Sequence, residues 1–359
     1  MPFMRDAISK VACGGNLSGE EARVAMSELM DGAATPAQIG SLLTALRMKG
    51  ETVEEIAAFA TIMREHARKI EPRVSSILTD TCGTGGDVLK TFNISTIAAL
   101  VISGAGAPIA KHGNRSFTGK CGSADLLERL GVNLNAEPEK VKISIEQAGI
   151  GFLFAPMFHA ATKNVAIPRK EIGIRTVFNL LGPLTNPASA RAQLLGVYEN
   201  GLVVKTAEVL RKLGVERAIV VHGVDGFDEV SLIGKTRVAR LENGNILEEN
   251  LTPASFGLEQ RSFGEISAAE DGVEEHALTA LRILHDSGNM SKKDRAVREM
   301  ILANASAGLV AAGKAGSYPD GVEMARDSLE TGKAFDKLNQ LVKYSGGDSS
   351  KIESLLAGI

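Results

Sequence analysis

Residues 80–123 read DTCGTGGDVLKTFNISTIAALVISGAGAPIAKHGNRSFTGKCGS, in which two loops rich in glycine and polar residues flank an apolar stretch of helical length. The first loop, Gly83 to Asp87, has three glycines, which accept backbone conformations that turn consecutive N–H groups toward one ligand. Residues 93–96 come where a helix should begin, and the N-terminus of a helix attracts anions. This stretch therefore predicts a site for a phosphorylated ligand.

The second loop, residues 111–116, places cations and amide donors after Pro108–Ala110, which predicts a strand. Residues 76–79 predict another strand in front of the first loop, so both loops would follow strands. Ligands of open α/β sheets bind beyond the carboxyl ends of the strands, and we therefore expect the two loops to face one crevice. A helix that opens near Ser123 would present a further N-terminus to the same side.

Beyond residue 76 the chain alternates apolar runs with helical patterns, which is typical of strand and helix units in a mostly parallel sheet. The expected elements are strands at 193–197 and 218–221 around a helix at 201–213, a hairpin at 236–246 that turns at Asn243-Gly244, and helices from about 273 to the end.

Residues 1–70 predict helices only. Ser18 with Glu21 and Thr52 with Glu55 have the spacing of capping boxes, each ahead of a helical apolar pattern. A further helix should start at Thr35-Pro36 and end at Gly50, with one apolar face made of Ile39, Leu42, Leu43 and Leu46. So small a bundle needs a surface to pack on, which is either the rest of the chain or a second copy of itself. We predict a homodimer through this region.

A chain of 359 residues exceeds the usual size of one core, so the length predicts two domains or one large α/β domain with an appendage. We assign two domains. The first is a small all-helical N-terminal domain, residues 1–72, with a returning segment around 165–188. The second is a large α/β domain, residues 73–359, whose central, mostly parallel sheet is flanked by helices.

The composition excludes several classes of protein. A net charge of −3 and a pI near 6.1 give no net positive potential that would attract nucleic acid or an anionic membrane. Cys13, Cys82 and Cys121 lie far apart without CxxC spacing, which argues against disulfides or structural zinc. No apolar run reaches membrane-span length and the N-terminus lacks the core of a secretory signal, so we expect a cytoplasmic location without a membrane partner.

Asp228-Glu229 follow the strand expected at 218–221, on a loop with glycines. Adjacent carboxylates at a strand end are hard oxygen ligands of the kind that Mg²⁺ takes beside a substrate phosphate. The simpler alternative is that they cap a turn.

Other candidates have equally plain alternatives. Glycine-rich turns after strands are common, and many bind nothing. Arg169 could pair with Glu171, and Cys82 is better explained as a small packing residue than as a nucleophile, since no dedicated base is evident. Three histidines are expected to be ordinary surface or core residues: His66, His276 and His285.

Six segments, in order, resemble the anthranilate phosphoribosyltransferases, whose fold is shared with the class II nucleoside phosphorylases. They are GTGGD at 83–87, T-x-N-I-S-T at 91–96, KHGNRS at 111–116, GKCGSAD at 119–125, R-x-x-x-G-I-R-T-x-F-N-x-L-G-P-L-x-N-P at 169–187 and G-x-D-E-V-S-x-x-G at 226–234. The resemblance implies transfer of a phosphoribosyl group from 5-phosphoribosyl 1-diphosphate to anthranilate, with release of diphosphate, in tryptophan biosynthesis.

The resemblance also implies roles for the matched residues. Those expected to bind 5-phosphoribosyl 1-diphosphate are Gly83, Gly86, Asp87, Thr91, Asn93, Ile94, Ser95, Thr96, Lys111, His112, Gly113, Asn114, Arg115, Ser116, Phe117, Thr118, Gly119 and Ser123. Those expected to face anthranilate or line its route are Gly83, Asn114, His159, Arg169 and Pro183. Two Mg²⁺ ions are implied, one near Ser95 and Glu229 and one held by Asp228 and Glu229.

The chemistry is compatible with these residues. Breaking the bond from ribose C1 to diphosphate develops negative charge on the leaving group, which N–H, hydroxyl and Lys111 donors and Mg²⁺ can stabilise. The aromatic amine is a neutral nucleophile, so no catalytic acid/base set is required and none is assigned; His112 is a possible proton acceptor after attack. Two rival functions remain: a pyrimidine nucleoside phosphorylase of the same fold, and a member without catalysis that binds a nucleotide or nucleic acid.

Overall fold

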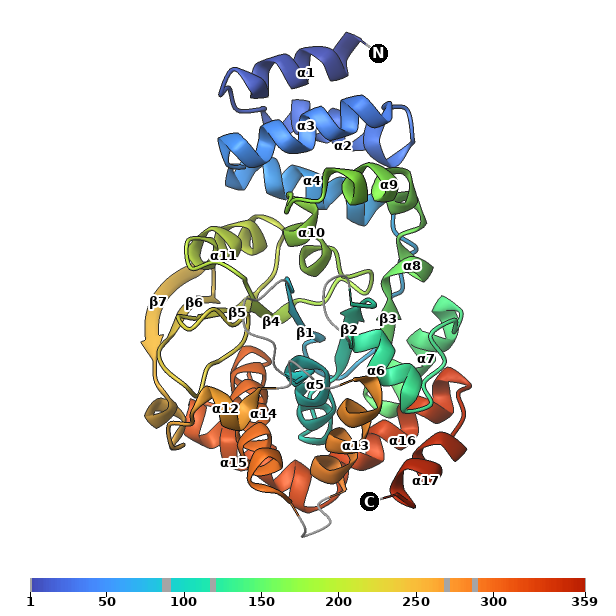
Figure 1. Cartoon of the computed structure of the whole chain (residues 1–359), viewed down its shortest axis with the longest axis vertical. Coiled ribbons are helices and arrows are strands. Elements are labelled where there is room, and N and C mark those ends of the chain that lie inside the picture. Colours follow the sequence, from blue (N-terminus) through green and yellow to red (C-terminus); the bar gives the residue numbers. More distant parts are fainter. Residues whose placement is uncertain (1, 86–91, 117–120, 268–271, 286–289, 359) are drawn as a thin grey trace.

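The computed structural model describes residues 2–85, 92–116, 121–267, 272–285 and 290–358 (Figure 1). A small bundle of helices lies at one end of the molecule, on a larger α/β part. The helices are α1 Pro2–Ala12, α2 Gly19–Met30, α3 Pro36–Lys49, α4 Val53–Glu65, α5 Ile94–Gly104, α6 Ser123–Arg129, α7 Pro138–Ala148, α8 Ala155–Phe158, α9 Lys163–Ile172, α10 Phe178–Leu184, α11 Leu202–Lys212, α12 Phe263–Ile266, α13 Val273–Leu284, α14 Lys292–Ala311, α15 Tyr318–Glu330, α16 Lys333–Ser345 and α17 Ser350–Leu356.

The described strands form one sheet in the order β3-β2-β1-β4-β5-β6-β7. The strands are β1 Thr79–Gly83, β2 Ile109–Gly113, β3 Ile150–Phe154, β4 Ala192–Gly196, β5 Arg217–Gly223, β6 Thr236–Glu242 and β7 Asn245–Leu251. Pairing is parallel from β3 to β5 and antiparallel from β5 to β7, which confirms the mostly parallel sheet. The chain leaves β1 toward β2 on one side and β4 lies on the other, so β1 is the switch point where such sheets bind ligands.

The β6–β7 hairpin is confirmed at the edge of the sheet. Its two turn residues, Asn243 and Gly244, have φ values of 51° and 76°. Two consecutive positive φ angles are what the commonest two-residue hairpin turn requires, and Asn-Gly is the residue pair that adopts them most readily.

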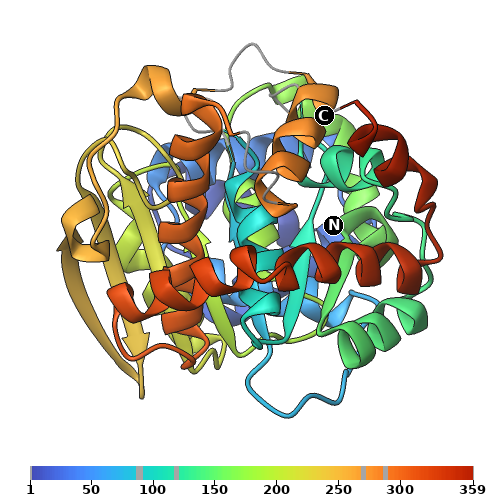
Figure 2. The same cartoon turned by 90° about the horizontal axis from the view of Figure 1, so that it is seen from below.

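Helices cover both faces of the sheet. Figure 2 looks onto the C-terminal helices, with the N-terminal bundle behind the sheet. One apolar core joins α5 and the helices after residue 272 to one face; a second joins the bundle, α10 and α11 to the other. The site is therefore supported from both sides by rigid packing.

The N-terminal bundle confirms the predicted helix signals. Ser18 and Thr52 each accept a hydrogen bond from the backbone N–H three residues on, and Glu21 and Glu55 complete the two capping boxes. Such caps contribute about 1 kcal/mol each. The apolar face of α3 is buried, and Gly50 ends this helix with a φ of 84°.

The segment between β3 and β4 returns to the bundle. Helix α9 packs against α3 and α2, and α10 packs against α4. Asn164 of α9 donates a hydrogen bond to the carbonyl of Met30 at 2.7 Å. The polypeptide therefore crosses between the bundle and the α/β part more than once.

Two strand predictions were wrong in position, and a third strand was not predicted. The first two strands begin later than expected and include residues assigned to loops, namely Asp80 and Thr81 in β1 and Lys111 and His112 in β2. These polar side chains are buried inside the sheet because each has a partner there; Asp80, for example, accepts the N–H of His112 at 3.1 Å. Strand β3 was missed, because its apolar run was interpreted as part of a helical segment.

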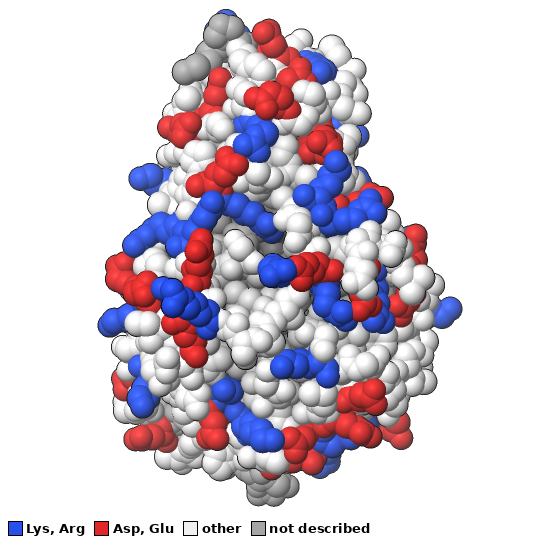
Figure 3. Space-filling view, turned by 180° about the vertical axis from the view of Figure 1, so that it is seen from behind, with Lys and Arg blue, Asp and Glu red and all other residues white. Residues whose placement is uncertain are grey.

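None of the helices in the described ranges is both long and apolar enough to span a membrane. Basic and acidic side chains alternate over the face in Figure 3, without a broad area of one sign.

Candidate active site

The acidic loop packs directly on the ends of β1 and β4. A Cβ atom added to Gly83 would collide with the Asp228 carboxylate, and one added to Gly196 would collide with the backbone of Asp228. Only glycine leaves room for this approach at either strand end. Asp228 and Glu229 are themselves 8% and 9% exposed.

The two carboxylates accept backbone N–H groups from the first loop and from the first turn of α5. Gly85, whose φ is 65°, donates its N–H to Asp228 Oδ2 at 2.7 Å. Ser95, in the first turn of α5, donates its N–H to Glu229 Oε1 at 3.2 Å. The structure thus brings together the glycine loop, the α5 N-terminus and the acidic loop, which are far apart in the sequence.

This donor set suits Mg²⁺. Two adjacent carboxylates and the nearby hydroxyl residue Ser95 provide hard oxygen atoms of the kind that Mg²⁺ binds. Within the described part of the chain, no group of three His, Cys, Asp or Glu side chains could hold a metal by itself. A cation here would complete its coordination with water or substrate oxygens, as Mg²⁺ usually does in proteins.

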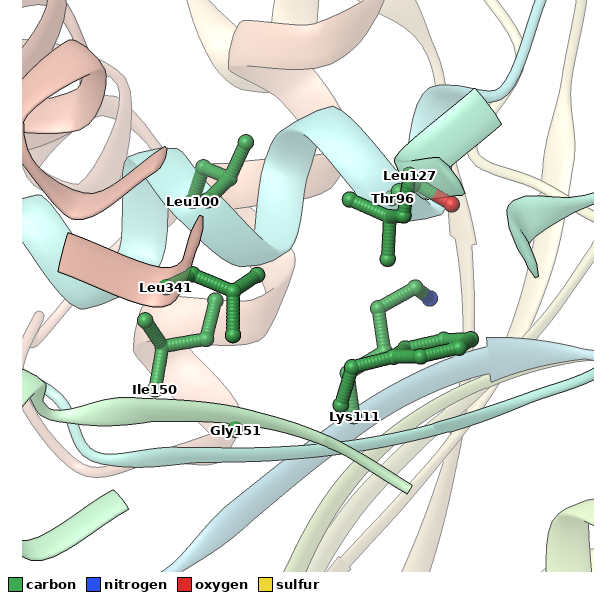
Figure 4. A pocket seen from close by; sticks show the side chains of 8 residues that line it. Thr96, Leu100, Lys111, Leu127, Ile150, Gly151 and Leu341 are labelled. Carbon is green, nitrogen blue, oxygen red and sulfur yellow. The ribbon is translucent and has the colours of Figure 1, made fainter. Parts of the chain in front are cut away.

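Lys111 lies inside strand β2 instead of in the loop that follows. Figure 4 shows its side chain extending from β2 toward Thr96 of α5, beside apolar residues. Its ammonium donates to the Thr81 carbonyl at 2.7 Å and lies 3.5 Å from Ser95 Oγ. Burial lowers the pKa of Lys111, and the Asp80 carboxylate opposes that effect. The prediction that Lys111 lies in a loop was therefore wrong. Its ammonium lies below the N-terminus of α5.

The second loop is braced by α6. Arg115 forms ion pairs with Asp125 and Glu128, each at 2.8 Å, so its guanidinium is bound to α6. The other Asp125 oxygen accepts the N–H of Ser116. Ser123 donates its hydroxyl to the Asn114 carbonyl at 3.1 Å, which ties the start of α6 to the loop.

Two buried histidines face each other below α10. The rings of His112 and His159 have centroids 5.1 Å apart, and the Nε2 atom of each is buried without a partner among the described residues. His112 Nδ1 lies 3.1 Å from the Gly182 carbonyl, next to Pro183. Burial lowers the pKa of His112 to about 3 and that of His159 to about 4, so both are neutral near pH 7. Buried polar atoms without a protein partner require another partner, such as water or a ligand.

These depressed pKa values predict a pH-dependent stability. Between pH 6.5 and 4, His112 and His159 are protonated in the unfolded chain but remain neutral in the folded protein. The free energy of unfolding therefore falls as the pH falls. Each histidine accounts for about 1.4 kcal/mol per pH unit in that window. His159→Asn should make the slope shallower by about that amount in urea unfolding at stepped pH. Equal slopes in wild type and His159→Asn would contradict this.

Arg169 is half-buried near the end of α9. Its guanidinium stacks over the Phe178 ring at 4.8 Å, and no carboxylate in the described ranges pairs with it, Glu171 included. Burial lowers the pKa of Arg169, yet an arginine remains charged at neutral pH. A half-buried cation without a carboxylate partner in the described ranges is well suited to bind a carboxylate ligand.

His276 is the residue that sequence reasoning missed. It was assigned to the ordinary histidines, but the structure places its Nδ1 atom 2.6 Å from Oδ1 of Asn93. Its ring also stacks on Phe92. No local signal could have paired residues 183 positions apart.

The remaining predicted residues fall into two groups. Ile94 and Thr96 are buried in the first turn of α5, and Gly113 ends β2 against Ser123 and Phe152. Predicted residues that lie outside the described part of the chain are Gly86, Asp87, Thr91, Phe117, Thr118 and Gly119. Cys82 is buried, and burial raises the pKa of its thiol, which is consistent with a packing role.

Comparison with known proteins gives a consistent result. Residues 5–67 match the family described as glycosyl transferase family, helical bundle domain, and residues 75–335 match glycosyl transferase family, a/b domain. The anthranilate phosphoribosyltransferase of Pelotomaculum thermopropionicum is 48% identical over 345 residues, covering 96% of this chain and 97% of that protein.

Solved structures agree with this match. The chain is similar to anthranilate phosphoribosyltransferase from Thermus thermophilus, with a TM-score of 0.87 and 43% identity over 95% of this chain and 99% of that one. It is also similar to the enzyme from Saccharomyces cerevisiae in complex with PRPP and Mg, with a TM-score of 0.85, 29% identity and coverage of 96% and 98%. Two family profiles and a relative aligned along nearly the whole length show that the chain belongs to the anthranilate phosphoribosyltransferase family.

Proposed function

We propose that the chain transfers the phosphoribosyl group of 5-phosphoribosyl 1-diphosphate to the amine of anthranilate and releases diphosphate, a step of tryptophan biosynthesis. The observation that carries this proposal is the convergence of the Gly85 and Ser95 N–H groups with the Asp228 and Glu229 carboxylates. Backbone donors and acidic side chains at one strand edge together suit an anion that arrives with a divalent cation.

Diphosphate would lie between the glycine loop and the α5 N-terminus. The N–H groups of Gly85 and Ser95 now donate to carboxylates, which occupy the positions that phosphate oxygens would take. Lys111, beneath the same turn, adds positive potential although its ammonium also holds the Thr81 carbonyl. Donors fixed before the reaction stabilise the leaving group as its charge grows.

Mg²⁺ is the cofactor that these residues fit. We propose two ions, one held by Asp228 and Glu229 and one approached by Ser95 and Glu229. When bound, they would supply charge neutralisation of the departing diphosphate. Asp228, Glu229 and Ser95 would hold the two ions at the ends of the strands, next to the first loop.

The acceptor would enter beside α10. His112, His159 and Pro183 lie together there, and the unpartnered Nε2 atoms can bind polar groups of the acceptor while remaining neutral. Arg169 would bind the anthranilate carboxylate with two parallel hydrogen bonds, while Gly83 and Asn114 lie at the strand ends that the acceptor faces. Positioning a neutral amine near ribose C1 provides proximity without a general base.

Turnover distinguishes this function from its rivals. The purified chain should convert anthranilate and 5-phosphoribosyl 1-diphosphate to phosphoribosylanthranilate in the presence of Mg²⁺, followed by fluorescence, with one diphosphate released per anthranilate consumed. Release of free base from a pyrimidine nucleoside and phosphate, with no diphosphate formed, would instead identify the nucleoside phosphorylase. Absence of both activities would favour a binding protein.

We further propose a domain division at residue 72, with the segment around 165–188 belonging to the helical domain, and a homodimer through that domain in the cytoplasm. The packing of α9 on α3 supports the division. Met48 of α3 and Ile167 of α9 are 83% and 68% exposed, and the two helices that carry them pack against each other.

The dimer can be tested by adding charge to this surface. Met48→Glu combined with Ile167→Glu is expected to convert a dimer to a monomer of 37.8 kDa in sedimentation equilibrium, because burying two carboxylates at an interface is costly. Leu247→Glu, at a residue 60% exposed on edge strand β7, is the matched control and should remain dimeric. An unchanged mass for the double variant would contradict this interface.

A further inference from the structure

Asn93 occupies the N-cap position of α5 but does not cap the helix. An asparagine at this position usually accepts a hydrogen bond from an N–H of the first turn. Here no such side-chain bond forms, and the carboxamide is turned toward two other segments. Its Nδ2 donates to the Cys121 carbonyl at 3.2 Å, and its Oδ1 lies 2.6 Å from Nδ1 of His276.

These two contacts fix the orientation of the amide. The Cys121 carbonyl can only accept, so the amide nitrogen of Asn93 must face it. The amide oxygen then faces His276, whose Nδ1 must carry the proton in order to donate. The second N–H of the Asn93 amide has no partner among the described residues, beside a helix N-terminus that suits an anion.

His276 is a rigid donor. It is 4% exposed, and its ring stacks on Phe92 with centroids 4.8 Å apart and an angle of 21° between the planes. Its helix, α13, lies beside α6 (Figure 1) and is joined to it by the ion pair of Glu274 with Arg129 at 2.5 Å. Helix α13 therefore contacts the N-cap residue of α5 through His276, and it contacts the helix that braces the second loop through Glu274.

We propose that His276 is a positioning residue for 5-phosphoribosyl 1-diphosphate. Its Nδ1–H holds the Asn93 carboxamide so that the second amide N–H is presented to the sugar diphosphate. This proposal rests on the proposed function, since it takes the ligand of Asn93 to be that substrate. His276 does not contact the substrate itself and acts only through Asn93.

Two substitutions separate the hydrogen bond from the packing. His276→Phe keeps a ring to stack on Phe92 but removes the donor, and should raise the KM for 5-phosphoribosyl 1-diphosphate about tenfold, with kcat and the anthranilate KM changed less than about twofold. His276→Asn places an amide donor near the former Nδ1 position and should restore most of the affinity. His285→Phe, at an exposed position at the end of the same helix, is the matched control and should behave as wild type.

A double-mutant cycle with Asn93→Ala tests whether His276 acts through Asn93. In that background His276→Phe should have less than a twofold effect on the KM for 5-phosphoribosyl 1-diphosphate, because the group that it orients is gone. A tenfold effect in both backgrounds, or no effect in the wild-type background, would overturn the proposal. Thermal unfolding verifies that the variants fold, and His276→Leu replaces the phenylalanine variant if the larger ring is not accommodated.

Calorimetric titration with 5-phosphoribosyl 1-diphosphate and Mg²⁺ tests the role of His276 separately from the proposed function. Binding to wild type and His285→Phe with about tenfold weaker binding to His276→Phe supports both. Equal binding to all three overturns only the role of His276. No binding to wild type overturns the proposed function and, with it, this inference.

Discussion

Asp228→Asn combined with Glu229→Gln is expected to lower Mg²⁺-dependent turnover about a thousandfold, which corresponds to about 4 kcal/mol of transition-state stabilisation. The amides keep the size of the side chains and can still accept the N–H groups of Gly85 and Ser95. They remove the charge that a cation requires, so the fold should persist while metal-dependent catalysis is lost. Initial rates measured over a range of Mg²⁺ concentrations, together with thermal unfolding, test this.

Glu248 and Glu249 provide a matched control for that experiment. They are also adjacent carboxylate residues, but they lie on edge strand β7 outside the site. Glu248→Gln with Glu249→Gln should leave the rate and its Mg²⁺ dependence within about twofold of wild type, as expected of surface substitutions. Normal turnover in the Asp228 and Glu229 variant would refute the metal role.

Arg169→Ala is expected to raise the anthranilate KM about thirtyfold to a hundredfold and the KM for 5-phosphoribosyl 1-diphosphate less than about threefold. The guanidinium is half-buried on the Phe178 ring and has no carboxylate partner in the described ranges. Its removal would therefore eliminate two charge-assisted hydrogen bonds to the anthranilate carboxylate. Steady-state kinetics with each substrate varied in turn measure the two constants.

Two further variants refine this test. Arg169→Lys keeps the charge but loses the forked geometry, so its anthranilate KM should lie between those of wild type and Arg169→Ala. Lys170→Ala removes the neighbouring exposed cation of α9 and should change neither KM appreciably. Equal increases in both KM values for Arg169→Ala would indicate a general structural role instead of carboxylate binding.

The sequence predicted those features that local chemistry determines. Capping at Ser18 and Thr52, the Asn243-Gly244 turn and the positive φ of Gly85 follow from the residues themselves, and the structure has them where expected. The glycine loop and the Asp228-Glu229 pair were each recognisable as ligand-binding types.

Features that depend on distant partners could not be predicted in the same way. Lys111 and His112 looked like loop residues because nothing nearby explains how a strand could bury them, and the explanation lies in Thr81, Asp80 and the Gly182 carbonyl. The contact of Asp228 with the Gly85 N–H depends on how β1, β4 and β5 are ordered in the sheet. The pairing of Asn93 with His276 likewise arises only when α13 packs beside α6.

A crystal structure of the chain with 5-phosphoribosyl 1-diphosphate and Mn²⁺, a heavier substitute for Mg²⁺, tests the central claim most directly. The anomalous signal of Mn²⁺ should lie within coordination distance of Asp228 and Glu229, with diphosphate oxygens bound to the N–H groups of the Gly85 loop and of Ser95. Diphosphate or Mn²⁺ bound at another edge of the sheet, away from these residues, would contradict the account.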